Sequence, residues 1–130
     1  MELKKQKLVT PFAAAILASI ANLGFIAFTR RTAEISTNFE PLTYGPVILA
    51  TSVAAFAGFG IYELLKKYTG QAKRYFLYTG GFVLVFSFMP IGHGALSMEN
   101  AGMAEINVLG VTHVLAFLIV TAVLFESDLR

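Results

Sequence analysis

The stretch that decides the fold is NVLGVTHVLAFLIVTAVLF, residues 107–125. It contains no Asp, Glu, Lys or Arg, and its one ionisable side chain is His113. A helix of ~17–25 apolar residues can cross the roughly 30 Å hydrocarbon core of a bilayer. A helix on the surface of a soluble protein would instead carry a polar face. The stretch therefore predicts a membrane span, and it raises the question of why a histidine lies inside it.

The rest of the chain repeats this pattern. The 130 residues are 56% hydrophobic and only 14% charged, against ~25% charged in an ordinary soluble domain. Charge-free stretches, the second of which ends at Tyr62, predict spans at about 8–29, 42–65, 75–92 and 106–125 in a single domain, residues 1–130. The third is the least regular, because it is the shortest and contains Gly80, Gly81 and Pro90.

Two alternatives to four retained spans can be weighed from residue type. A soluble all-α protein is disfavoured, since PFAAAILASIANLGFIAF (residues 11–28) has no charged face. A cleaved signal peptide would fit the basic leader of Lys4, Lys5 and Lys7. The apolar run that follows is, however, longer than the ~7–15 residues of a signal peptide's apolar region. We therefore expect the first span to be retained.

The basic residues predict the orientation. With the N-terminus in the cytoplasm, only Arg30 and Arg31 lie outside, and the cytoplasmic side receives Lys4, Lys5, Lys7, Lys66, Lys67, Lys73, Arg74 and Arg130. Positive residues near membrane spans are retained on the cytoplasmic side. The sequence thus predicts a multi-pass protein of the cell membrane with both termini cytoplasmic. Its pI near 9.0 is then a topology signal, so no nucleic-acid partner is predicted.

Short connections between spans predict an all-α, up-down-up-down four-helix bundle. Small residues recur every fourth position, as a stripe of Ala14, Ala18 and Asn22 and a stripe of Ala50, Ala54 and Gly58. Such stripes let helix backbones approach closely in lipid. We expect the first two helices to meet along them, although one stripe could instead serve a homo-oligomer.

Polar side chains fall at one depth in the outer half of the predicted bundle. At ~1.5 Å rise per residue, His113 lies level with Asn22, Thr51, Ser52 and Ser87. One interpretation is a hydrogen-bonded clasp between helices, and the other is a ligand-binding pocket that opens outward with His113 at its floor. Ionisable groups inside membranes are functional candidates by default. In either case we expect His113 to point into the bundle and to bond with Asn22 or Thr51.

Further ionisable residues surround the predicted outer mouth, namely Arg30, Arg31, His93, Glu99 and Glu105. Arg30 or Arg31 could pair with Glu105. The histidines and glutamates have the side chains of a metal site but not its close spacing, and His93 and His113 are expected at depths too different to bracket a haem. The chain has no cysteine and no motif of a known catalytic centre. We therefore predict no catalytic residue, metal or cofactor.

Four segments carry a family resemblance: ASIANLGFIAF (18–28), GPVILATSVAAFAGFGIYELL (45–65), VLVFSFMP (83–90) and LGVTHVLAFLIV (109–120). They resemble a family of small bacterial four-span membrane proteins of unknown function. Asn22, the Ser87–Pro90 segment and His113 are the most specific elements, whereas the IGHG segment with His93 departs from the family pattern. The resemblance implies a four-helix membrane domain and no particular activity.

Three classes of function remain open at this point. The leading prediction is a non-enzymatic binding or accessory protein, with membrane lipids as partners and a possible homo-oligomeric state. A small transporter or channel subunit is the second, although the predicted spans carry no acidic residue at mid-membrane. The third is a membrane enzyme that acts on a lipid or quinone, with His113 as acid or base.

Overall fold

The fold is all-α, as the sequence predicts, and is described by a computed structural model. Its backbone is described for residues 2–93 and 102–130, and its side chains for residues 8–89 and 102–130. Four α-helices and one short 3₁₀-helix make up the described regular structure: α1 (Glu2–Thr32), η1 (Glu40–Leu42), α2 (Tyr44–Tyr68), α3 (Ala72–His93) and α4 (Met103–Ser127).

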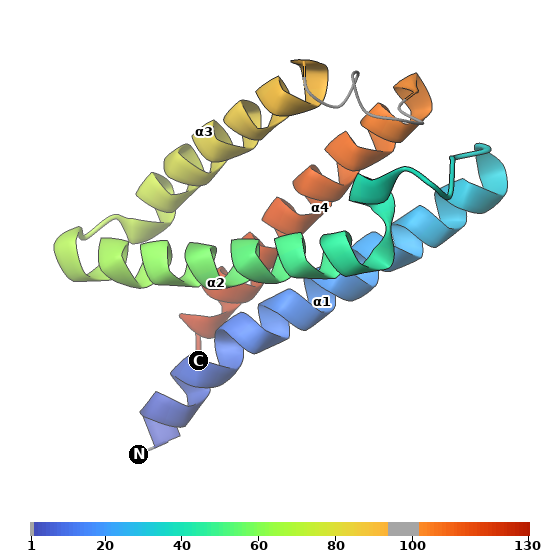
Figure 1. Cartoon of the computed structure of the whole chain (residues 1–130). Helices are drawn as coiled ribbons and strands as arrows, with labels where there is room; N and C mark the ends of the chain where they lie inside the picture. Colours follow the sequence, from blue (N-terminus) through green and yellow to red (C-terminus); the bar gives the residue numbers. More distant parts are fainter. Residues whose placement is uncertain (1, 94–101) are drawn as a thin grey trace.

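The helices form the predicted bundle (Figure 1). Consecutive helices run in opposite directions, so both termini lie at the same end of the molecule as the α2–α3 connection. We call this the terminal end, and we call the other end, with η1 and the start of α4, the loop end. Helix α1 packs mainly against α2 and α4, while α3 packs against α4 and less closely against α2.

Three helices are long and apolar enough to cross a membrane: Leu8–Thr32, Tyr44–Tyr68 and Met103–Ser127. Large apolar side chains point away from the bundle, such as Ile20 and Leu49 at 63% and 67% exposed, as a lipid environment allows. The described part of α3 does not join this set, because Lys73 and Arg74 follow its first residue and lower its hydropathy. These three candidate spans indicate a multi-pass membrane protein, and the fourth crossing stays a prediction.

The core of the terminal end combines small residues with an aromatic cluster. Ala14 and Ala18 of α1 meet Ala55 of α2, and all three are 0% exposed. The ring of Tyr62 packs edge-on against Phe76 of α3, with centroids 5.3 Å apart. Small residues let α1 and α2 approach closely, and the rings fill the wider space between α2, α3 and α4.

The α1–α2 connection folds back over the loop end. Glu34 adopts a left-handed backbone conformation (φ 47°) just after α1 and reverses the chain. Ile35, Phe39 and Leu42 are then buried in a second apolar cluster with Ile26 of α1. These contacts close one end of the bundle without a long helix.

The small-residue stripe predicted for α2 does not pack where it was expected. The packed residues of α2 are instead Thr51 and Ala55, each one position after a stripe residue. Ala50 and Ala54 are exposed, so the prediction that Ala54 lies at a helix contact is wrong. Gly58 does lie at one: a Cβ added there would be 3.3 Å from Val120 of α4. On α1, by contrast, the stripe of Ala14, Ala18 and Asn22 is buried throughout.

Helices α3 and α4 interlock through two aromatic rings set on glycines. The ring of Phe117 lies against Gly80, where an added Cβ would come within 2.4 Å, and the ring of Phe88 lies against Gly110, where it would come within 2.9 Å. These contacts position α3 on α4. Since α3 packs less closely on α2 than on α4, the space between α2 and α3 is left incompletely filled.

Candidate functional site

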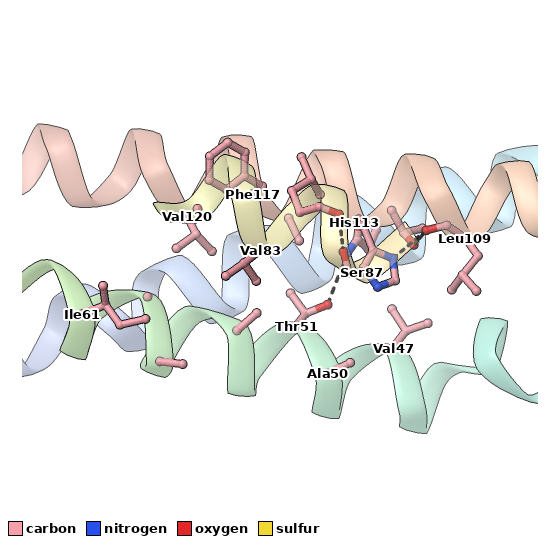
Figure 2. A pocket seen from close by; sticks show the side chains of 18 of the residues that line it. Val47, Ala50, Thr51, Ile61, Val83, Ser87, Leu109, His113, Phe117 and Val120 are labelled. Carbon is pink, nitrogen blue, oxygen red and sulfur yellow. Dashed lines mark hydrogen bonds between the residues drawn. The ribbon is translucent and has the colours of Figure 1, made fainter. Parts of the chain in front are cut away.

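A cavity of about 360 Å³ lies between α2, α3 and α4 (Figure 2), and Asn22 of α1 and Pro41 of η1 also line it. Its volume is within the ~300–1,000 Å³ typical of sites for small molecules. The walls are mainly apolar or small. They comprise Pro41, Pro46, Val47, Ala50, Ala54, Ala57, Gly58, Ile61, Phe76, Gly80, Val83, Leu84, Leu109, Ala116, Phe117 and Val120.

Polar side chains gather in the half of the cavity nearer the loop end, where α2, α3 and α4 each contribute at least one. This polar end consists of Asn22, Thr51, Ser87, Thr112 and His113. The structure thus brings together four of the five residues predicted for a polar pocket. Ser52, the fifth, is half-buried and does not line the cavity. Thr112 was not predicted, although its place next to His113 on α4 could have suggested it.

Helices α1 and α2 are joined by a hydrogen bond at this level. The Asn22 amide nitrogen donates to the hydroxyl oxygen of Thr51 over 3.2 Å. Both residues are almost fully buried. A clasp between these helices is therefore present, but it does not include His113.

His113 points into the bundle as predicted, but its predicted partner is wrong. Its Nδ1 lies 2.8 Å from the backbone carbonyl oxygen of Leu109, one turn earlier on the same helix, and Figure 2 shows the imidazole in the space between α4 and α2. Since a carbonyl oxygen only accepts, Nδ1 donates this bond, and Nε2 is the acceptor in the neutral ring. The nearby carbonyl satisfies the ring within its own helix, so no bond to Asn22 or Thr51 is needed.

One buried polar atom at this end has no protein partner. Asn22 is 2% exposed, and its Oδ1 makes no hydrogen bond with any described residue. An unsatisfied buried acceptor costs ~1–3 kcal/mol. Among the described residues this acceptor therefore stays unsatisfied.

The cavity extends further than the predicted pocket. Its lining continues past His113 to Ile61, Phe76 and Thr79, close to the terminal end. His113 is thus in the wall of the cavity and is not its floor, which corrects the prediction. The lining includes three exposed residues, Ala50 and Ala54 of α2 and Val83 of α3. The cavity therefore opens sideways between α2 and α3.

The residues predicted for an outer mouth do not pair as expected. Arg30 donates to the carbonyl oxygen of Leu42 over 3.0 Å and lies over the ring of Tyr44. Glu105 is 7% exposed and accepts from the backbone N–H groups of Ser36 and Gly102, at 2.8 and 3.1 Å. This carboxylate therefore joins the α1–α2 connection to the start of α4.

The remaining mouth residues add no described contact to the cavity. Arg31 is exposed and does not line it. The side chain of His93 and the whole of Glu99 lie outside the described residues. Within the described part of the chain, no three His, Asp or Glu residues are grouped closely enough to hold a metal ion.

A second polar cluster, not predicted from the sequence, lies at the terminal end. Asp128 accepts hydrogen bonds from the Tyr62 hydroxyl and, over 3.0 Å, from Lys66. Partial burial favours a higher pKa for Asp128, but the bonds from Tyr62 and Lys66 outweigh it and hold the pKa below its usual value. This cluster ties the C-terminus to α2. No sequence signal marked the cluster, because Asp128 is more than sixty residues away from both Tyr62 and Lys66.

Comparisons with known proteins identify the chain by family alone. Neither a search of functionally characterised proteins nor one of solved structures finds a match. A family model described as "Family of unknown function (DUF6069)" matches residues 4–128. The chain therefore belongs to this family, in agreement with the resemblance found in the sequence.

Proposed function

We propose that this member of the DUF6069 family is a non-enzymatic membrane protein that binds a lipid-like molecule in the cavity between α2, α3 and α4. The observation that carries the proposal is the division of the cavity into two parts. One part is apolar and open to the side, and the other holds Asn22 and His113 with unused hydrogen-bonding atoms. A ligand with an apolar tail and a small polar group matches both parts.

The proposal includes four spans with both termini in the cytoplasm. It is supported by the basic residues near the α2–α3 connection, Lys66, Lys67, Lys73 and Arg74, because this connection lies at the same end of the bundle as the two termini (Figure 1). Only Arg30 and Arg31 are placed on the opposite side. In this arrangement the side opening between α2 and α3 faces lipid, from which a lipid-like ligand can enter.

Binding is favoured over catalysis by the surroundings of His113. A catalytic base is usually oriented by a third group, such as a carboxylate. Here the orienting partner is the backbone carbonyl of Leu109, and the described residues that line the cavity include no Asp, Glu, Lys or Arg. The same lack of charge in the described lining disfavours an ion pathway.

The test is to fill the cavity without disturbing the helix contacts. Ala54→Phe places a ring in the opening, since Ala54 lines the cavity and is exposed. Val53→Phe is the matched control, because Val53 is 60% exposed and lies outside the lining. Each protein is purified in mild detergent from membranes, and retained lipid is measured by native mass spectrometry.

We expect wild type and Val53→Phe to retain a bound lipid-like molecule and Ala54→Phe to lose most of it, with similar thermal stability for all three. Equal retention by the two variants would mean that the retained lipid sits elsewhere and would refute a cavity site. Absence of any retained molecule from wild type would also count against it.

A further inference from the structure

We infer that the polar group of the ligand is an uncharged hydroxyl that donates a hydrogen bond to His113. This inference rests on the proposed function and names the chemical class of the ligand. It follows from which hydrogen-bonding atoms at the polar end are already used by the protein and which are left over.

Four donors at the polar end are committed within the protein. The hydroxyls of Ser87 and Thr112 donate to carbonyl oxygens of their own helices, those of Leu84 and Leu109, each over 2.7 Å. The imidazole Nδ1 also donates to the Leu109 carbonyl, over 2.8 Å. The fourth donor is the amide of Asn22, which is bound to Thr51. A ligand that only accepts, such as a ketone or an ether, is offered none of these four groups and can bond only to the Thr51 hydroxyl, whereas a hydroxyl ligand can also donate.

The atoms left over include two acceptors, together with the hydroxyl proton of Thr51, a residue that accepts from Asn22 and donates to no described residue. With Nδ1 donating to a carbonyl, Nε2 of the neutral imidazole carries a free lone pair. Asn22 Oδ1 is buried and has no partner among the described residues. Both residues line the same cavity. A hydroxyl is the smallest group that can donate to one of these acceptors without bringing a charge.

Charge selects further among possible donors and acceptors. The described lining has no Asp or Glu to neutralise an ammonium and no Lys or Arg to neutralise a phosphate or carboxylate. Placing an unpaired charge in such a site is far more costly than placing a hydroxyl. The chemistry shared by suitable ligands is therefore a neutral hydroxyl on an apolar body, whether a lipid alcohol or a phenol such as a reduced quinone.

The test compares ligands that differ only in the polar group. Equilibrium binding is measured with protein in phosphatidylcholine nanodiscs, with empty nanodiscs subtracted, for radiolabelled 4-decylphenol, its methyl ether 4-decylanisole, and decyl phosphate. We expect the phenol to bind about tenfold more tightly than the ether, the effect of one buried hydrogen bond worth ~1.4 kcal/mol. Decyl phosphate should show no saturable binding. A parallel measurement with 1-tetradecanol distinguishes an aliphatic alcohol from a phenol as the preferred source of the hydroxyl.

His113→Phe should reduce phenol binding to the level of the ether and leave ether binding unchanged. Equal affinities for phenol and ether in wild type would overturn the inference, and so would tighter binding of the ether or of decyl phosphate. All of these outcomes are measured on the wild-type protein, so they do not depend on whether the His113 variant folds. Ala54→Phe separates this failure from that of the proposed function. If Ala54→Phe abolishes binding of both the phenol and the ether, the cavity is the site even when the ligand's hydroxyl has no effect on affinity. If Ala54→Phe leaves binding of both ligands unchanged, the cavity is refuted as the site.

Discussion

Helix α2 presents two faces of small side chains that differ by one residue in register. The face of Thr51 and Ala55 is packed against α1 and is 4% and 0% exposed, whereas the face of Ala50 and Ala54 is exposed along the cavity. We call these the closed face and the open face. Successive residues of a helix point about 100° apart, so a shift of one position is enough to separate them.

The partner helices explain why one face is closed and the other open. Helix α1 also carries small residues at the contact, Ala14 and Ala18, and a pair of small surfaces can approach closely. Helix α3 instead packs on α4, through Phe117 at Gly80 and Phe88 at Gly110. A small-residue stripe thus permits close packing but does not require it. Where no matching helix comes near, the same stripe lines a cavity.

The largest expected effect concerns α3, the helix across the cavity from the open face. Either α3 crosses the membrane or it does not, so the result is all-or-none. If α3 crosses the membrane, reporter fusions at Arg130 and within residues 69–72 will both read cytoplasmic. If α3 does not cross, α4 would carry the C-terminus to the opposite side. Opposite readings at the two positions would therefore rule out the four-span arrangement and remove the lipid-facing opening. Alkaline phosphatase and green fluorescent protein fusions at each position provide complementary readouts.

The next largest effect is the loss of stability when a larger side chain is added at the closed face, compared with the same change at the open face. Ala18→Leu adds a large side chain at a fully buried position of α1, which should destabilise the fold by roughly 1–3 kcal/mol. Ala54→Leu adds the same atoms to the open face and should change stability by less than ~0.5 kcal/mol. Unfolding in mixed detergent micelles measures both. Similar losses from the two substitutions would show that the open face is packed after all.

A smaller effect is expected from the hydrogen bond of the closed face. Thr51→Val keeps the side-chain shape but removes the acceptor of the Asn22 bond. Such bonds between membrane helices contribute ~0.6 kcal/mol on average and ~1.7 at most, so we expect a loss in this range. Thr79→Val is the control, since Thr79 is exposed on α3 and should be nearly neutral. A larger loss at Thr79 would contradict the assignment of the clasp to the closed face.

The smallest effect lies at the terminal end, where Asp128 joins the C-terminus to α2. The pKa of Asp128 is lowered in the folded protein, so its contribution is complete above the unfolded value of ~3.9 and is lost as the pH falls through the folded value. Asp128→Asn should therefore slightly destabilise the fold at pH 7, by the ~0.2–1 kcal/mol of a surface pair, and the difference should shrink as the pH falls through the lowered pKa of Asp128.

Thermal unfolding of Asp128→Asn and wild type across this pH range provides the measurement. A difference that grows as the pH falls would have the wrong sign for a depressed pKa and would contradict the described contacts with Tyr62 and Lys66. The open face should be unaffected, because the cluster does not touch it.

Depth alone selected four residues that line the cavity, but it also included Ser52, which does not line it, and missed Thr112, which does. Asn22, Thr51, Ser87 and His113 lie at the same level because the rise per residue of a helix is constant, and the structure places all four around one cavity. Their hydrogen bonds could not be predicted in this way. Depth does not define rotation about the helix axis, and rotation decides that His113 bonds to its own helix while Asn22 bonds to Thr51.

The sequence by itself determined the class of the molecule and the family to which it belongs. Long charge-free segments can be stable only as helices in an apolar environment, because there the backbone must satisfy its own hydrogen bonds. Only the tertiary structure decided which face of α2 is closed and which is open. That choice depends on contacts between residues far apart in the chain, such as Phe117 with Gly80 and Asn22 with Thr51, and no local pattern specifies which of two equally small faces meets a matching surface.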